Sequence, residues 1–232
     1  MTALPACYSA RNIVAVRASR LNADGSRICP NTDGSAFMTS GVISFTSDAV
    51  VDAGATDVQR DGDGNICSTL TNPDAVTGRR GTLTICKLDF QLIEILTGSQ
   101  PAEDGSFFIG VEDPDPDDTP PLVEFHWWAK AWSGGGQAAS PYGYVHGALW
   151  ASQWRVGNLN FANGPLSFPL SYTAQANESI SIGSFDDIPP VFNGQGFAGL
   201  WFADDVPVAS ASPYNAAGLT CGYVDTPACS SS

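Results

Sequence analysis

The sequence predicts a mainly β protein: a sandwich or barrel of antiparallel strands with one short flanking helix and long loop extensions. Short segments rich in β-branched and aromatic residues recur between turn residues. The 24 glycines and 16 prolines favour many turns over long helices, and only one segment has helical periodicity. No internal repeat or linker divides the chain, so we expect residues 1–232 to form a single domain with extended loops.

Strands are expected wherever such segments are bounded by turn residues. These segments are 12–19, 41–45, 81–86, 107–112 and 122–132.

The clearest alternation of apolar and polar residues lies at 167–176. There Phe168, Leu170 and Tyr172 fall on one face of the predicted strand and small polar residues on the other. Pro169 lies on the polar face and lacks a backbone donor, so we expect this strand at the edge of its sheet.

One helix is expected at residues 89–98. Asp89 can cap its N-terminus, apolar residues follow from Leu92 at helical spacing, and Gly98 suits the left-handed position past its end. About three turns are too few for a helix to be stable alone, so this helix is expected to pack on the sheet.

Two segments are expected to be loops. The stretch 112–121 contains five carboxylates and four prolines and cannot pair in a central strand. Residues 133–143, SGGGQAASPYG, are typical of a flexible connection. The C-terminal TPACSSS is a candidate for a flexible tail. The acidic loop provides candidate site residues for a lumen or a subunit contact: Glu112, Asp113, Asp115, Asp117 and Asp118.

The charge of the chain excludes several functions. Its net charge is −14, and no Lys or Arg follows Arg155. Binding to phosphates or to anionic membranes depends on clustered Lys and Arg, so neither is expected. No apolar run approaches a membrane span, and the N-terminus lacks the pattern of a signal peptide.

The stretch RDGDGNIC places Asp61, Asp63 and Asn65 at the spacing of calcium-loop ligands. An EF-hand loop needs glycine at its sixth position and glutamate at its twelfth, which are here Ile66 and Asn72. Asp-Gly and Gly-Asn pairs are instead typical of turns between antiparallel strands. We therefore predict a hairpin tip, with no metal.

No enzyme or cofactor motif stands out. The stretch GQGFAG at 194–199 matches a dinucleotide-binding pattern, but no helix is predicted after it, so we interpret it as a chance match. The pairs Asp186–Asp187 and Asp204–Asp205, with six tryptophans, leave a carbohydrate-binding or carbohydrate-cleaving β-sandwich open as an alternative.

The six cysteines form no CxxC motif, and we expect them to be reduced core residues. A disulfide-stapled secreted domain is the alternative. Zinc is not expected, because His126 and His146 lack ligand spacing.

Two blocks of sequence form a recognisable combination. In the first, the strand GTLTICKLD runs into the helix FQLIEILTG. In the second, FHWWAKAWSGG precedes YGYVHGALWASQWRVGNLNFANGPLSFPLSYTAQA, with a turn from Gly157 to Pro165. This combination resembles the major tail tube proteins of long-tailed, siphovirus-type bacteriophages, especially those of actinobacterial hosts. The resemblance covers roughly residues 80–176. The acidic loop and the cysteine-bearing tail have no counterpart in the family pattern.

The resemblance implies a β-sandwich with a flanking helix, similar to the tube protein of type VI secretion. It also implies hexameric rings that stack into a hollow tube, with no catalysis and no cofactor. The expected partners are further copies of the chain and other tail proteins, such as the tape measure and terminator, and the expected location is the virion tail, assembled in the host cytoplasm. Six subunits would carry about −84 per ring, and carboxylates on a lumen wall would repel passing DNA.

Self-assembly also predicts exposed Trp and Phe at subunit contacts and a role for the hairpin tip between rings. A tail terminator or a capsid decoration protein is the alternative within the same class.

Overall fold

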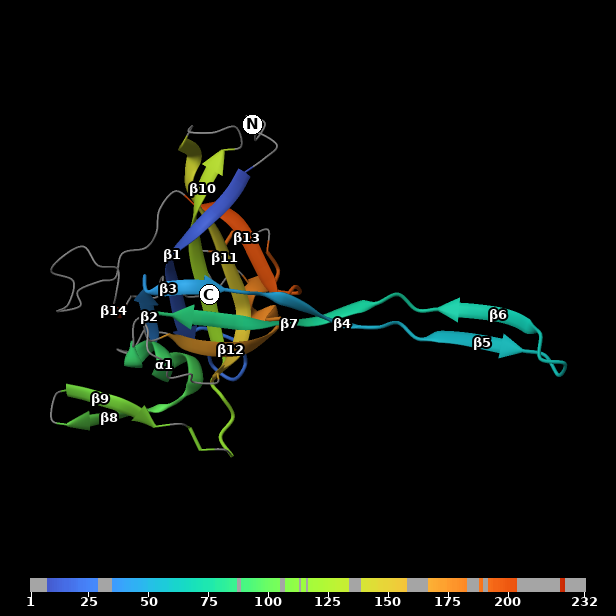
Figure 1. Ribbon diagram of the computed structural model, residues 1–232, viewed down its shortest axis with the longest axis horizontal. Coiled ribbons are helices and arrows are strands. Elements are labelled where there is room, and N and C mark those ends of the chain that lie inside the picture. Colours follow the sequence, from blue (N-terminus) through green and yellow to red (C-terminus); the bar gives the residue numbers. More distant parts are fainter. Residues whose placement is uncertain are drawn as a thin grey trace.

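The fold is an antiparallel ten-stranded sheet that curls into a half-barrel, with two separate hairpins (Figure 1). It confirms the mainly β prediction. The computed structural model describes residues 8–28, 35–86, 89–104, 107–112, 114–115, 117–133, 139–157, 167–182, 188–189, 192–203 and 222–223.

The strands of the large sheet follow the order β14-β2-β1-β10-β11-β12-β7-β3, with β13 pairing to β11 and β4 to β7. Their bounds are β1 Tyr8–Arg20, β2 Ala36–Thr39, β3 Val42–Phe45, β4 Asp48–Asp52, β7 Ala75–Ile85, β10 Val123–Ser133, β11 Ala139–Val156, β12 Phe168–Gln175, β13 Ala198–Ala203 and β14 Gly222–Tyr223. The separate hairpins are β5 Thr56–Arg60 with β6 Ile66–Thr71, and β8 Gln100–Asp104 with β9 Phe107–Glu112.

All six strand segments predicted from the sequence are strands. Strand β11 begins at Ala139, so part of the predicted flexible connection at 133–143 is wrong, and residues 134–138 lie outside the described residues. The start of β11 pairs with the end of β10 instead of forming a loop, with Ala139 opposite Trp132.

The edge position predicted for residues 167–176 is wrong, because β12 lies between β11 and β7. The predicted alternation is confirmed from Leu170 onward. Pro169 is tolerated because its carbonyl accepts from the N–H of Gly157, just past the end of β11. The N–H and C=O of one residue in a strand point the same way, so the missing donor faces a position where the partner strand has already ended.

The predicted helix is confirmed as α1, Phe90–Thr97, and Gly98 adopts the predicted left-handed conformation with φ 78°. Asp89 occupies the N-cap position, but its side chain makes no capping bond and instead accepts a hydrogen bond from Thr39. At the other end, the guanidinium of Arg20 donates to the carbonyls of Glu94 (2.6 Å) and Ile95 (3.4 Å). The Glu94 carbonyl also accepts from the N–H of Gly98 (2.8 Å), so Arg20 adds a second donor to the last turn of the helix.

The helix packs against the inner side chains of the curled sheet. Leu92, Ile95 and Leu96 join one buried cluster with Phe125 and Trp154. A second helical element, the 3₁₀ turn Glu178–Ile182, was not predicted. Among the described residues, no helix is long and apolar enough to span a membrane.

Candidate interaction surfaces

The most unusual feature is an arm, residues 51–77, which projects from the half-barrel as a two-stranded ribbon (Figure 1). It consists of the end of β4, the hairpin β5–β6 and the start of β7. From Val51 to the turn at Asp61 there are ten residues, so the arm reaches about 33 Å at about 3.3 Å per residue. Every residue of the arm is exposed except Gly54, which is half-buried.

The arm carries most of the exposed apolar side chains. Seven large hydrophobic residues are exposed in the described part of the chain, and five of them lie on the arm: Val51, Val58, Ile66, Leu70 and Val76. Leu70 is 61% exposed and Ile66 57%. The expectation of exposed Trp and Phe is wrong for the described residues, because the exposed residues are aliphatic. Isolated two-stranded ribbons are marginally stable in water, so the arm lacks the packing that such a ribbon ordinarily needs.

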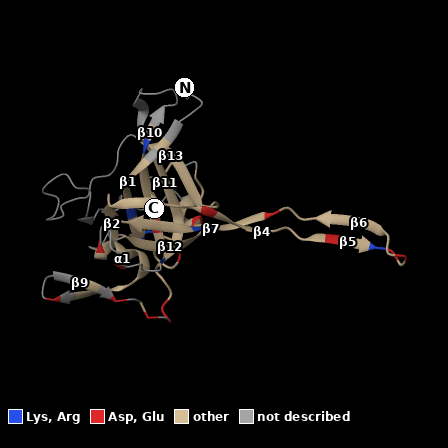
Figure 2. Cartoon of the chain, viewed as in Figure 1, with Lys and Arg blue, Asp and Glu red and all other residues tan. Residues whose placement is uncertain are grey.

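The arm is acidic and ends in a tight turn. Five aspartates oppose one basic residue, Arg60, between residues 51 and 77, and Figure 2 shows acidic residues at the tip. The five aspartates are Asp52, Asp57, Asp61, Asp63 and Asp74.

The predicted hairpin tip is confirmed, since β5 and β6 pair on either side of it. The carboxylate of Asp61 accepts from the N–H of Asp63 (3.0 Å), the N–H of Asn65 (2.8 Å) and the side-chain amide of Asn65 (3.0 Å). The hydrogen bonds from Asn65 are the largest cause of a lowered pKa of the Asp61 carboxyl. Asp61 thus holds the turn closed, and the described residues contain no metal-binding cluster of three or more His, Cys, Asp or Glu residues.

The acidic loop lies apart from the arm. Glu112 ends β9, and Asp115, Asp117 and Asp118 form a small exposed turn in which Asp118 N–H donates to the Asp115 carbonyl (2.9 Å). The remaining candidate, Asp113, lies outside the described residues. The structure therefore does not bring the two predicted acidic groups together on one surface.

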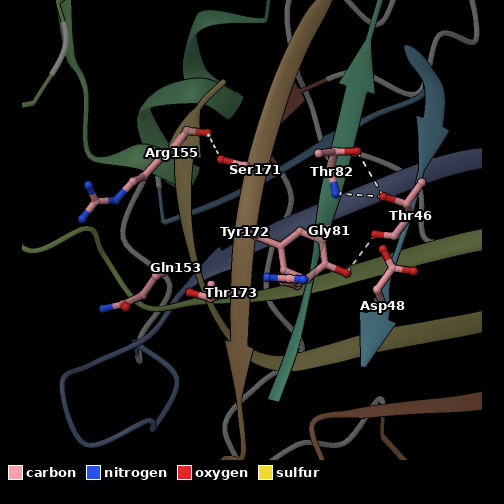
Figure 3. Close-up of a pocket in the computed structure, with 10 residues that line it drawn as sticks. Thr46, Asp48, Gly81, Thr82, Gln153, Arg155, Ser171, Tyr172 and Thr173 are labelled. Atoms are coloured by element: carbon pink, nitrogen blue, oxygen red, sulfur yellow. Dashed lines mark hydrogen bonds between the residues drawn. The ribbon is translucent and has the colours of Figure 1, made fainter. Parts of the chain in front are cut away.

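A polar groove of about 730 Å³ opens on the face of the sheet at the base of the arm (Figure 3). Side chains alternate across three neighbouring strands: Thr82, Ser171 and Arg155 form one row, and Arg80, Thr173 and Gln153 form the next. Thr46, Asp48, Gly81 and Tyr172 complete its lining.

The wall of the groove is fixed by hydrogen bonds. The hydroxyl of Tyr172 donates to the carbonyl of Thr46 (3.0 Å), and the N–H of Thr82 donates to the Thr46 hydroxyl (3.0 Å). Burial raises the pKa of Tyr172 to about 12, so this hydroxyl keeps its proton at neutral pH. A Cβ at Gly81 would collide with the Thr46 carbonyl, so glycine is required for this close approach.

Arg80 and Arg155 are the chemically distinctive residues of the groove. Both are exposed, and neither guanidinium makes a hydrogen bond or an ion pair with any residue that the structure describes. By contrast, Arg27 is buried in a bidentate ion pair with Glu124, at 2.8 and 2.9 Å. The groove is therefore a place where two cationic side chains remain available in a strongly acidic protein.

The ion pair of Arg27 belongs to a buried chain of hydrogen-bonded polar residues. Two of them, Glu124 and His126, alternate along β10 with the core residues Val123 and Phe125. His126 Nε2 lies 2.7 Å from the Glu124 carboxylate, and His126 Nδ1 lies 2.8 Å from His146 Nε2. Burial alone would raise the pKa of Glu124, but the charges and hydrogen bonds of Arg27 and His126 outweigh it and lower that pKa to about 2. Because all four residues are buried, they stabilise the fold rather than meet a ligand.

The features behind the carbohydrate alternative are not brought together in the described residues. Trp128, Trp150 and Trp154 are at most 1% exposed and form part of the core. Asp48 is the one carboxylate that lines the groove, whereas glycoside cleavage ordinarily uses two. The aspartate pairs at 186–187 and 204–205 lie outside the described residues.

The stretch at 194–199 leads into strand β13, which supports its interpretation as a chance match. Of the six cysteines, Cys67 and Cys86 are described, and both are free and exposed. Their free state agrees with the expectation of reduced thiols at these two positions, but the expected core location is wrong for both.

Sequence reasoning found the tip but missed the arm and the groove. The arm could have been suspected from 27 residues that contain no aromatic side chain and few adjacent apolar ones. The groove depends on which strands pair, and no local pattern shows that. No protein-family model matches this chain, and a search of curated proteins finds no relative.

Proposed function

We propose that this chain is a structural subunit that assembles with copies of itself, as the tail tube of a long-tailed bacteriophage does. The observation that carries the proposal is the arm. It exposes five large aliphatic side chains on a ribbon that touches no core. A concentration of exposed apolar side chains on one projecting element is typical of an interaction site.

The arm supports self-assembly more than ligand binding. A two-stranded ribbon offers no concave surface for a small molecule, whereas it can lie along a neighbouring subunit and cover its aliphatic side chains there. Repetition of one such contact between identical chains generates a ring or a filament.

The charge of the chain supports a conduit in particular. A net charge of −14 opposes any stable contact with phosphates, and a channel for DNA must let the polymer slide without binding it. Rings of identical acidic subunits would repel DNA from the wall over about one Debye length, roughly 8–10 Å at physiological salt. The curled sheet with one flanking helix is also compatible with the fold that the resemblance implies.

Negative-stain electron microscopy of the purified chain tests the proposal. We expect rings or tubes of constant diameter at high protein concentration. Particles that stop at a single ring would favour a tail terminator. A monodisperse monomer at high concentration would contradict self-assembly.

A matched variant sharpens this test. Replacing residues 53–74 with a two-residue Asn-Gly turn joins the paired residues Asp52 and Ala75, which shortens the arm and leaves the sheet and α1 unchanged. This variant should fold, with the far-ultraviolet circular dichroism of a β protein, and it should remain a monomer.

A further inference from the structure

We propose that the polar groove at the base of the arm is the docking site for the acidic arm tip of a second copy of this chain. This inference rests on the proposed function, because it names the surface that receives the arm. Three properties of the described residues lead to it: the position of the groove, its charge and its chemistry.

The groove lies too far from the tip of its own chain to bind it, so the tip that docks there must come from a second molecule. Asp48 and Arg80, which line the groove, are paired residues in β4 and β7 at the root of the arm. The tip lies about 33 Å further along the same ribbon, and Figure 1 shows the ribbon pointing away from the half-barrel. A chain therefore cannot place its tip in its own groove. Each copy has one tip and one groove, so the contact can repeat from copy to copy.

The charges of the two surfaces are complementary. Asp63 is exposed at the tip and Asp57 is exposed on β5, four residues before Asp61, and their carboxylates make no hydrogen bond with any described residue. In the groove, the guanidinium groups of Arg80 and Arg155 are equally free of described partners. Guanidinium–carboxylate pairs are the strongest common polar contacts at interfaces, and Arg presents a fork that matches a carboxylate.

The chemistry of the lining also suits a polar hairpin turn. Thr82, Ser171 and Thr173 supply hydroxyls that can donate to backbone carbonyls or accept from backbone N–H groups. The groove volume, about 730 Å³, lies in the range of about 300–1,000 Å³ that is usual for ligand sites. The groove lacks an exposed aromatic ring among its lining residues, so it fits an acidic peptide better than a sugar or a nucleobase.

Charge reversal tests the contact by sedimentation velocity. We expect R80E/R155E to weaken association by about tenfold or more, and D57K/D63K to weaken it likewise, because each places like charges opposite one another. Combining all four substitutions should restore association. Asp61 is left unchanged because it closes the turn. The control K130E reverses an exposed cation on β10, outside the groove, and should associate as the parent does.

A cross-linking experiment gives a second readout that does not depend on the folding of charge-reversed chains. Cys67 is exposed close to the tip, so T173C should form disulfide-linked multimers on mild oxidation in a background whose other five cysteines, Cys7, Cys29, Cys86, Cys221 and Cys229, are replaced with serine. The same background carrying C67S, or T119C in place of T173C, should give none. Disulfides require Cα atoms within about 7 Å, so the cross-link reports close contact.

The outcomes separate this inference from the proposed function. If the parent assembles but R80E/R155E assembles equally well and T173C forms no cross-link, the groove is not the docking site and self-assembly stands. If the parent remains a monomer, the proposed function fails and the inference fails with it.

Discussion

The aliphatic side chains of the arm should drive assembly without contributing to folding, and two substitutions test this directly. Ile66 and Leu70 are 57% and 61% exposed on β6, and both belong to the arm. Replacing both with serine removes apolar surface that only a neighbouring copy can cover. Because neither side chain is part of the core, the half-barrel should not be affected.

The size of the effect follows from the exposed fractions. Fully burying a Leu or Ile side chain contributes about 1.5–3 kcal/mol, so covering the exposed three-fifths of each contributes about 1–1.8 kcal/mol. The two together account for about 2–3.5 kcal/mol per contact. At about 1.4 kcal/mol per factor of ten, I66S/L70S should weaken association by roughly 30- to 300-fold.

Sedimentation velocity over a concentration series measures the association constant, and differential scanning fluorimetry measures the midpoint of unfolding of the monomer. The midpoint should shift by no more than corresponds to a change of about ±0.5 kcal/mol in the free energy of unfolding, the usual range for surface substitutions. The matched control is I43S/L200S, which removes two side chains of equal exposure, 56% and 63%, from outside the arm. Equal association of I66S/L70S and the control, or a large loss of monomer stability in I66S/L70S alone, would refute the reasoning.

Three further predictions concern the body of the protein. Glu124 has a pKa of about 2 in the folded chain against 4.5 ordinarily, so its stabilising effect should be complete above pH 4.5 and lost progressively as pH falls toward 2. E124Q should flatten that part of a pH–stability curve and cost about 3–5 kcal/mol at pH 7 in urea unfolding, because Arg27 stays buried without its charge partner; an unchanged curve would contradict this. G147V should lower the unfolding midpoint sharply, because a Cβ at Gly147 meets the ring of Trp127, and a wild-type midpoint would show that the ring can move. Thiol titration of the denatured chain should count six reactive cysteines, whereas three disulfides would leave none.

Local patterns were sufficient to predict α1, the hairpin tip and six of the strands: β1, β3, β7, β9, β10 and β12. Alternation placed β12, and the run from Asp89 to Gly98 placed α1 with its left-handed end. These features depend on periods of two and 3.6 residues and on the conformational freedom of glycine, which the sequence displays directly.

Features that depend on pairing between distant strands could not be predicted in this way. Pro169 favoured an edge strand, but β12 lies between β11 and β7. The proline is tolerated in this central strand because β11 ends where its missing N–H would point. Arg80 and Arg155 are 75 positions apart and meet in one groove only because β12 pairs with both β7 and β11. The tip at Asp61 was accessible to sequence reasoning because its hydrogen bonds are local.

A cryo-electron microscopy reconstruction of the purified, concentrated chain would show directly where the arm lies. We expect a hollow tube in which density for residues 51–77 of each copy lies on a neighbouring subunit, with its acidic tip beside Arg80 and Arg155. Single subunits with the arm free in solvent, or an assembly in which the arm contacts no other copy, would contradict this expectation.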